Sequence, residues 1–591
     1  MSSVGNEKRG KRLSRMYPAG GWWDSFKPLP WLAVRLGALL TIYMMLDLIL
    51  QNVCHLSETS YRQPVILFEL LGQWFGLNAW ITHGSAIIRE RGTILAVPMI
   101  LVYGMALIIR YPSCWRNYRA LWCRWSIFVD SAAVRPLILV IAFLATWLAS
   151  TYDYNLYFNQ AHYADRFLLI LLVLLVSWRP VFVFPFLFLL LGIFHQFSYP
   201  YENNPSWPEL NLLIRALALF GSTFLIHVLT GRRETVDFAF ALCCLVASSY
   251  WGSGIGKFQL NWISHPYLHL LVFGAYANGW LGFWESSTIT VLSKTLSYAT
   301  IPLMVITLLL EWGSICFLWK RSWTLVFLAG FILFHAGIFF VTGMFFWKWI
   351  LVELALIVYL TWSLGHRHVD IFSPSYFALS IIVIAGSPIW FQPTNLSWYD
   401  TRVTYLRSIE AIGESGSRYQ LSPQTFTPYR DLFTLGPFSF LSKHPQLTGI
   451  WGITSNRAIA RKLVSVSTPR QVFALEEEMG SVNFNEKASA KFDEFIVRFI
   501  GNLNERRSKR TALSMFQPPP HLWTCPKNNT FRSQERIRKV IIYEVTFFYD
   551  GTQFSSIRQR VIRVIDIPVE PNVQHRHQVS SVGIRWLSSK C

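Results

Sequence analysis

Charged residues are scarce in this sequence. Only 15% of its 591 residues are Asp, Glu, Lys or Arg, whereas 52% are hydrophobic, and the mean hydropathy is +0.33. A soluble globular protein carries about 25% charged residues, so this chain has too little polar surface to fold in water alone. The charges are sparse between residues 31 and 391 and dense near both ends. This distribution indicates a lipid-embedded body between two water-exposed ends.

The sequence also lacks the motifs of metal and nucleic-acid sites. Its eight cysteines have no metal-like spacing, and no zinc finger, glycine-rich phosphate loop or basic helix accompanies the net charge of +20. We therefore expect no bound metal and no nucleic-acid partner. Cys243 and Cys244, which are adjacent in an apolar run, are interpreted as packing residues. Lys and Arg collect on the cytoplasmic side of membrane spans, and this tendency accounts better for the positive charge.

Long apolar runs are abundant. A helix needs about 20 mostly apolar residues to cross the hydrocarbon core, and this length predicts between about nine and eleven spans. The segment 167–197 is split by Arg179 and Pro180 into two pieces that are each short for a span, so we interpret it as a helical hairpin. The remaining predicted spans are 31–51, 93–110, 134–151, 211–230, 235–256, 295–317, 322–345, 347–364 and 374–391.

The loops between these spans differ in charge. The predicted outer loop 197–210 contains Glu202 and Glu209 and no Lys or Arg. The predicted inner loops are basic, which fits the positive-inside rule, and contain Arg110, Arg116, Arg119, Arg124, Arg232, Arg233, Lys320, Arg321 and Arg367. We therefore expect a basic cytoplasmic tail over 1–30, a transmembrane domain over 31–391 and an extracytoplasmic domain over 392–591.

The C-terminal region has the character of ordinary soluble protein. Residues 403–412 and 417–421 flank a Gly-Glu-Ser-Gly turn, and 539–549 alternates before Asp550-Gly551 and a second alternating run to 567. Both patterns predict β-hairpins. Residues 471–506 have helical periodicity, and the prolines at 518–520 indicate a linker. We expect an α+β domain that is mostly β.

Each ionisable residue within a span costs about 2.5 to 3.5 kcal/mol on insertion scales, and four such residues in or at the end of predicted spans stand out. They are Asp47, Lys257, Glu311 and His335. For Asp47 and Glu311 we favour pairing between helices, with Arg35 and Arg215 as candidate partners. His335 is either a structural polar contact between helices or a group that passes a proton.

Lys257 follows three glycines at alternate positions, which permit close approach of backbone or ligand. A lysine kept from water has its charged form disfavoured, so its neutral amine would be available as a base. The alternative is a side chain that extends along the helix end to the interface. The loop 153–163 gathers polar and aromatic residues and is interpreted as an aromatic belt in preference to the floor of a site.

The segments 252–262 and 334–346, with the opening 35–47, resemble the horizontally transferred transmembrane domain family, which includes the vitamin K-dependent gamma-carboxylases. The resemblance covers roughly residues 30–365, and the C-terminal region is similar in kind to the tails of that family. Two positions differ from the carboxylase motif, which has a second lysine in place of Gly256 and an aspartate in place of Asn261.

The resemblance implies a membrane enzyme in which Lys257 deprotonates a reduced quinone of the vitamin K hydroquinone type. Oxygenation of the quinol then yields a base that removes the γ-proton of a protein glutamate, and the carbanion captures CO2. The cofactor would be the quinol, with CO2 and O2 as co-substrates and a secreted or membrane protein as substrate. The implied catalytic residues are Lys257, His162, His335 and Asn159, and the implied cofactor-binding residues are Gly252, Gly254, Gly256 and Trp262.

Two other functions remain open from the sequence. A non-catalytic scaffold or folding helper for secreted proteins, similar to a lipase maturation factor, would use Lys257 only structurally. A transporter would explain the interrupted segment 167–197, but the sequence shows no ion-binding cluster or inverted repeat. The sequence does not reveal the oligomeric state.

Overall fold

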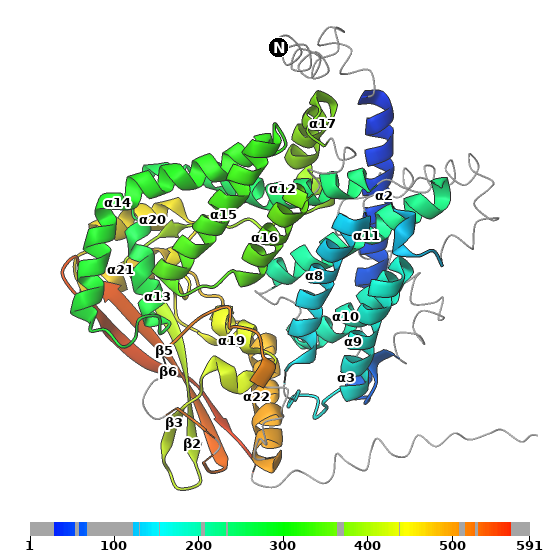
Figure 1. Cartoon of the computed structure of the whole chain (residues 1–591). Coiled ribbons are helices and arrows are strands. Elements are labelled where there is room, and N and C mark those ends of the chain that lie inside the picture. The colour runs from blue at the N-terminus through cyan, green and yellow to red at the C-terminus, as the bar shows by residue number, and fades with distance from the viewer. Residues whose placement is uncertain are drawn as a thin grey trace, which may run out of the picture.

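The computed structural model describes residues 29–53, 58–67, 122–128, 131–152, 154–201, 207–231, 235–362, 371–436, 438–506, 515–525, 530–532 and 534–568. Among these residues, helices are the main regular elements up to residue 390, and helices and strands follow in a C-terminal region (Figure 1). The predicted basic tail, except for its last two residues, and the predicted span 93–110 lie outside the described residues.

Six of the described helices are long and apolar enough to cross a membrane. Their ranges agree with predicted spans to within a few residues at most ends, because apolar length alone specifies them. They are α2 (Leu29–Val53), α8 (Ser131–Ser150), α11 (Trp207–Thr230), α12 (Val236–Leu260), α14 (Ser286–Gly313) and α15 (Arg321–Thr342).

Shorter apolar helices lie beside these six. The segment 167–197 is a helical hairpin, as predicted, with its break at Arg179 and Pro180, where a 3-10 turn (Pro180–Phe182) begins. Its two helices have 16 and 14 residues, which is about 24 and 21 Å at the usual rise and shorter than the hydrocarbon core. The shorter helices are α9 (Tyr163–Trp178), α10 (Val183–Gln196), α16 (Trp347–Trp362), α17 (Pro374–Ala385) and α18 (Ser387–Trp390).

Large apolar side chains cover the outer surfaces of several helices. On α14, Val291 is 64% exposed, Tyr298 79% and Leu309 66%, and on α15, Leu333 is 71% and Phe340 72% exposed. A water-soluble helix buries its apolar stripe and turns charged residues outward. Here both faces are apolar, so the outer face needs a lipid environment.

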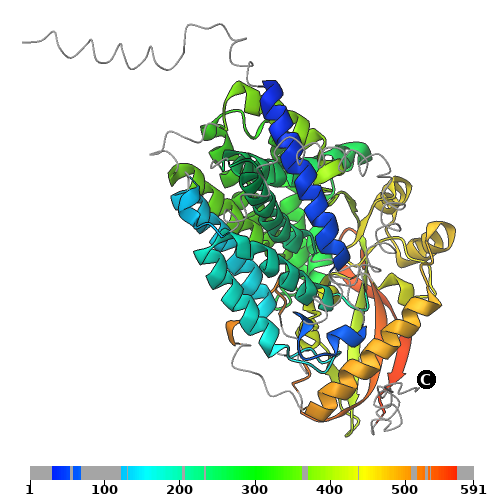
Figure 2. The ribbon, with the colours of Figure 1, turned by 90° about the vertical axis from the view of Figure 1, so that its right-hand side faces the viewer.

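The start of α2 and the C-terminal region lie at opposite ends of the molecule (Figure 2). At one end, Arg35 of α2 pairs with Asp237 of α12, and Asp237 also accepts a hydrogen bond from Tyr376 of α17 at 3.0 Å. At the other end, Arg498 of the C-terminal region pairs with Glu58, just after α2.

Two hairpins build the main sheet of the C-terminal region, in the order β3-β2-β5-β6. Both were predicted. They are β2 (Val403–Gly413) with β3 (Arg418–Gln420), and β5 (Ile537–Tyr549) with β6 (Phe554–Asp566). The antiparallel pairing of β2 with β5, for example Val403 opposite Phe548, joins them across more than a hundred residues. A separate pair consists of β1 (Tyr399–Asp400) and β4 (Ile453–Thr454).

The expectation that strands make up most of the C-terminal domain was wrong. Helices take up about as much of the described C-terminal region as strands do, because 457–506 forms three amphipathic helices. The predicted helix over 471–506 is two helices, separated by a short connection after Gly480. The helices are α19 (Arg430–Leu435), α20 (Arg457–Ser465), α21 (Pro469–Met479) and α22 (Glu486–Arg506).

The helix α22 docks the C-terminal region on the loop 154–162. The ring of Phe495 stacks on Tyr157 at 5.0 Å, and Asn502 Nδ2 donates to the carbonyl of Leu156 at 2.5 Å. Tyr157 and Phe158 are only 3% and 2% exposed. This loop is therefore packed against protein and does not form the lipid-facing aromatic belt that we expected.

Candidate functional site

A buried ion pair lies in the last two turns of α12. Lys257 Nζ donates to Glu311 Oε1 of α14, and the two side chains are 12% and 3% exposed. The Trp262 ring lies 5.5 Å from the Lys257 nitrogen. Glu311 Oε2 is buried and has no hydrogen-bond partner among the described residues. The predicted pairing of Glu311 across helices is confirmed, but its partner is Lys257 and neither arginine.

A second polar cluster lies two turns earlier on α12. Tyr250 precedes Lys257 by seven residues and therefore lies on the same face of the helix. Its hydroxyl donates to Glu353 Oε1 of α16 and lies 3.4 Å from His335 Nε2 of α15. The other imidazole nitrogen, Nδ1, is 3.6 Å from Glu353 Oε2. His335 is 6% exposed and Glu353 is fully buried, so three helices share a polar contact in an apolar interior.

Other side chains of the chain itself pack against the three glycines of α12. A Cβ at Gly252 would lie 2.8 Å from Pro393 Cγ, and one at Gly254 would lie 2.5 Å from Trp312 Cδ1. A Cβ at Gly256 would overlap Asn395 Oδ1. The glycines thus permit close approach, as expected, but the approaching groups are the segment 393–397 and α14.

Asn159 and His162 lie in a different part of the molecule from Lys257. Asn159 is exposed, and its side-chain oxygen accepts from Tyr154 and from Arg506 of α22, both at 3.0 Å. The contact with Arg506 ties the loop to the C-terminal region, whereas the contact with Tyr154 lies within the loop.

His162 is 2% exposed at the start of α9. Its Nδ1 lies 3.3 Å from Asp165 and its Nε2 3.1 Å from the Tyr61 carbonyl. Asp165 also accepts from the backbone of Ile66 at 2.8 Å. These bonds fix the segment 58–67 to α9, so the structure gives His162 a structural role and does not bring it to Lys257.

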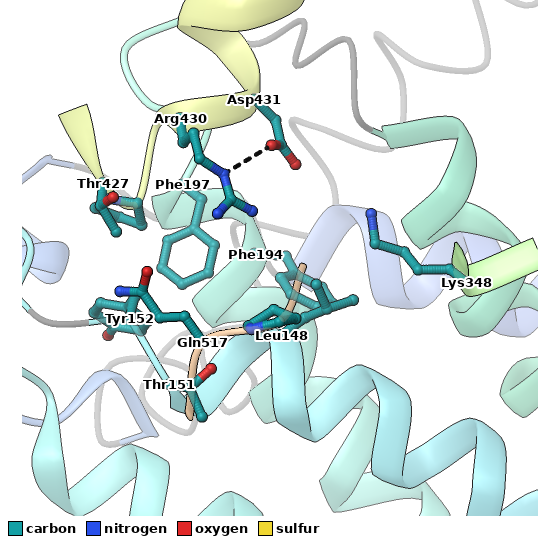
Figure 3. A pocket seen from close by; sticks show the side chains of 12 residues that line it. Leu148, Thr151, Tyr152, Phe194, Phe197, Lys348, Thr427, Arg430, Asp431 and Gln517 are labelled. Atoms are coloured by element: carbon teal, nitrogen blue, oxygen red, sulfur yellow. Dashed lines mark hydrogen bonds and ion pairs between the residues drawn. The ribbon is translucent and has the colours of Figure 1, made fainter. Parts of the chain in front are cut away.

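A small cavity lies where the C-terminal region meets α8, α10 and α16. It has a volume of about 70 Å³, and Arg430 and Asp431, 3.4 Å apart, line it from the C-terminal side (Figure 3). Phe194 and Phe197 line it from α10, and Lys348, 2% exposed, from α16 (Figure 3). A larger cavity of about 310 Å³ lies beside β2, between the C-terminal region and residues 277–279.

Sequence reasoning missed Tyr250, Glu353 and Lys348. The cost of ionisable groups in spans applies equally to Glu353 and Lys348, which lie in the predicted span 347–364, so that signal was present. Tyr250 gives no such signal, because a tyrosine near a helix end is ordinary. Among the described residues, no group of three His, Cys, Asp or Glu side chains is arranged to hold a metal ion.

Comparison of this chain with protein-family models, with curated proteins and with solved structures finds no match in any of the three.

Proposed function

We propose that this chain is an integral membrane enzyme that spans the bilayer between about nine and eleven times. Its N-terminus would be cytoplasmic and residues 392–591 would lie outside the cytoplasm. The six long apolar helices and their exposed apolar side chains support the embedding. The basic inner loops and the separation of α2's start from the C-terminal region support the sidedness.

We further propose that its reaction is carboxylase-like. A reduced quinone of the vitamin K hydroquinone type would be oxygenated, and glutamate side chains of a secreted or membrane protein would be carboxylated. The observation that carries this proposal is the acid–base centre on one face of α12, where Lys257–Glu311 and Tyr250–Glu353–His335 lie two turns apart. Burial of such groups costs several kcal/mol in total, so each of them needs a partner, a watery cavity or a role in the reaction.

The glycine face of α12 does not fit a quinone, because Pro393, Trp312 and Asn395 fill it. Glu311 Oε2 fits better, since it is a buried acceptor without a hydrogen-bond partner in the described part of the chain. When bound, a reduced quinone would supply a hydroxyl proton and, with O2, the base that precedes CO2 capture. Glu311 would hold that hydroxyl by accepting its hydrogen bond.

The ion pair determines which group can accept a proton. While Lys257 donates to Glu311, the nitrogen carries its proton and the carboxylate is the acceptor. Transfer of the proton from Nζ to the carboxylate leaves a neutral amine and a carboxylic acid, so the pair can present either base. The Trp262 ring beside the nitrogen keeps bulk water from one side of it.

Quinol-dependent incorporation of labelled bicarbonate into a glutamate-containing peptide tests this proposal. We expect Lys257→Ala to reduce incorporation at least about 100-fold, because general acid–base groups contribute about 10² to 10⁴ in rate. Lys294→Ala is the matched control, since Lys294 is exposed on α14 and should retain full activity. Equal incorporation by Lys257→Ala and the control would reject the mechanism.

A second candidate function is a non-catalytic scaffold or folding helper for secreted proteins. The filled glycine face and the structural contacts of Asn159 and His162 favour it. In that case the full-length protein should crosslink to secreted partners equally well with Lys257 or Ala at position 257. It should also leave a reduced quinone unchanged.

A further inference from the structure

The larger cavity, of about 310 Å³, shares no residue with the acid–base centre of α12. Cavities that bind small molecules span about 300 to 1,000 Å³ and combine an apolar lining with a few placed polar groups. An aromatic wall of Phe426, Phe433 and Phe438 supplies the apolar lining here, and the first two rings stack with centroids 3.9 Å apart. The cavity therefore has the size and the apolar lining of a small-molecule site.

The cavity lies at the open edge of β2. The strand β3 pairs with β2 only at residues 410–412, and the Ile409 carbonyl then accepts from the Leu421 N–H at 2.9 Å. In the described part of the chain no strand continues along this edge, and the cavity lies beside residues 406–409. Backbone groups of alternate residues point to the same side of a strand, so the N–H and C=O of Arg407 point toward this open edge.

The side chain of Arg407 lines the cavity and is 5% exposed, yet its polar contacts are long. Nη1 lies 3.5 Å from the Tyr405 carbonyl and Nη2 lies 3.4 Å from Glu544 Oε2. Its Nε is buried and has no hydrogen-bond partner among the described residues. Burial lowers the pKa of Arg407, and Glu544 offsets only part of that effect. A buried guanidinium without a full set of partners is costly, so a ligand that supplies one would bind favourably.

The carboxylate that faces Arg407 is shared with a second arginine. Glu544 Oε1 lies 3.2 Å from Arg560 Nε on the neighbouring strand β6. The next arginine of that strand, Arg558, pairs with Glu476 at 2.6 Å. The three arginines thus share two carboxylates among the described residues, which leaves one positive charge without a counter-charge.

We propose that this cavity binds an organic monocarboxylate with an apolar body. The carboxylate would accept hydrogen bonds from Arg407 and supply the missing negative charge, and the aromatic wall would hold the apolar body. A phosphate dianion would bring more negative charge than the one that is missing. The inference does not rest on the proposed function, because no group of the α12 centre lines the cavity.

An extended peptide fits this edge of β2 less well than a small molecule does. The Ile409 carbonyl is already bonded to Leu421, and the Val403 carbonyl accepts from the Thr448 hydroxyl at 2.7 Å. The open stretch between these two residues is too short to hold a peptide strand in register.

Protection of Cys525 from alkylation tests the proposal, because this partly exposed thiol lines the cavity. In a full-length variant with every other cysteine replaced by serine, the rate of alkylation by N-ethylmaleimide is measured in detergent. The probes are propionate, benzoate, octanoate and 2-naphthoate. We expect octanoate or 2-naphthoate to slow the alkylation, and the matched amide to bind at least about 10-fold more weakly, because it cannot form the charge-assisted hydrogen bond. In a cysteine-free background, Glu478→Cys on α21 is the control whose alkylation the probes should not change.

Two variants separate the charge from the space. Arg407→Gln leaves Glu544 paired with Arg560 and should make carboxylate and amide bind equally. Ser422→Trp, which puts a large side chain into the cavity, should weaken the binding of both. The proposal would be overturned if none of the carboxylates slowed the alkylation, or if carboxylate and amide were equally effective in the protein with Arg407. A preference for the carboxylate that survived in Arg407→Gln would also overturn it, as would protection by an acidic peptide alone.

Discussion

At the scale of residues, the contact between Lys257 and Glu311 changes how the lysine must be understood. The sequence predicted a polar lysine near a helix end and suggested a free amine, because the apolar neighbours of Lys257 are adjacent in the chain. Glu311 is 54 residues away, and no local pattern links the two. Their pairing depends on how α12 packs on α14, which is tertiary information. In the proposed reaction, the base is therefore the pair, and not the lysine alone.

The four catalytic residues implied by the family resemblance divide into two groups. Lys257 of α12 and His335 of α15 make contacts between helices of the bundle. Asn159 and His162 instead hold loops to neighbouring segments. Resemblance of short motifs could not separate these cases, because the positions of Asn159 and His162 follow from the docking of α22 and of the segment 58–67.

Asp400 makes a residue-scale prediction about stability and pH. Its pKa is about 8 in the folded protein and about 4 in the unfolded chain. Between these values the folded state binds more protons, so the contribution of Asp400 to stability is present below pH 4 and is lost as the pH rises through 8. We expect Asp400→Asn to raise Tm relative to the wild type at pH 9 and much less at pH 5, measured by thermal unfolding in detergent. A difference in Tm that is independent of pH would contradict this.

At the scale of elements, the helices were the predictable part. Apolar length predicted α8, α11, α12 and α15 closely, since the bilayer sets the required length. The two hairpins were predicted from alternation and turn residues. The pairing of β2 with β5 was not, because it joins segments separated by more than a hundred residues, which include the helices α19 to α22. The helix 471–506 was predicted as one element because the break after Gly480 has no proline.

The close packing along α12 predicts the effect of alanine at two glycines. A Cβ at Gly256 meets Asn395 and Ser397, whereas a Cβ at Gly337 of α15 meets nothing within 4 Å. Gly256→Ala should lower the unfolding free energy by about 1 to 3 kcal/mol through overpacking. Gly337→Ala should leave it unchanged or raise it by up to about 1 kcal/mol. The measurement is chemical denaturation in detergent.

Removal of the opposing side chains provides the control for this prediction. Asn395→Ala combined with Ser397→Ala should restore most of the stability lost in Gly256→Ala. If the triple variant is no more stable than Gly256→Ala alone, the segment 393–397 does not lie where the structure places it.

At the scale of the whole molecule, the contacts between the C-terminal region and the helices are extensive. Besides α22, the strand-like pairing of Met344 with Leu522 and the hydrogen bond from Cys525 to Gly279, at 3.0 Å, attach residues 515–525 to the ends of α13 (Leu271–Ala277) and α15. The sequence indicated two regions of different composition, and it could not show that they pack as one body, because their contacts join residues far apart in the chain.

The proposed sidedness predicts opposite labelling of two exposed positions. In a variant with all eight cysteines replaced by serine, Glu478→Cys on α21 should react with a membrane-impermeant maleimide in sealed, right-side-out vesicles. Lys320→Cys, between α14 and α15, should react only after permeabilisation. Reaction of both positions from the same side would contradict the topology.

The proposed reaction depends on the Lys257–Glu311 pair acting as an acid–base centre on a quinol. The decisive experiment is formation of the quinone epoxide from vitamin K hydroquinone and O2 by purified protein in nanodiscs. We expect epoxide with the wild type and with Lys294→Ala, and at least about 100-fold less with Lys257→Ala. No epoxide with the wild type, or equal amounts with all three proteins, would contradict it.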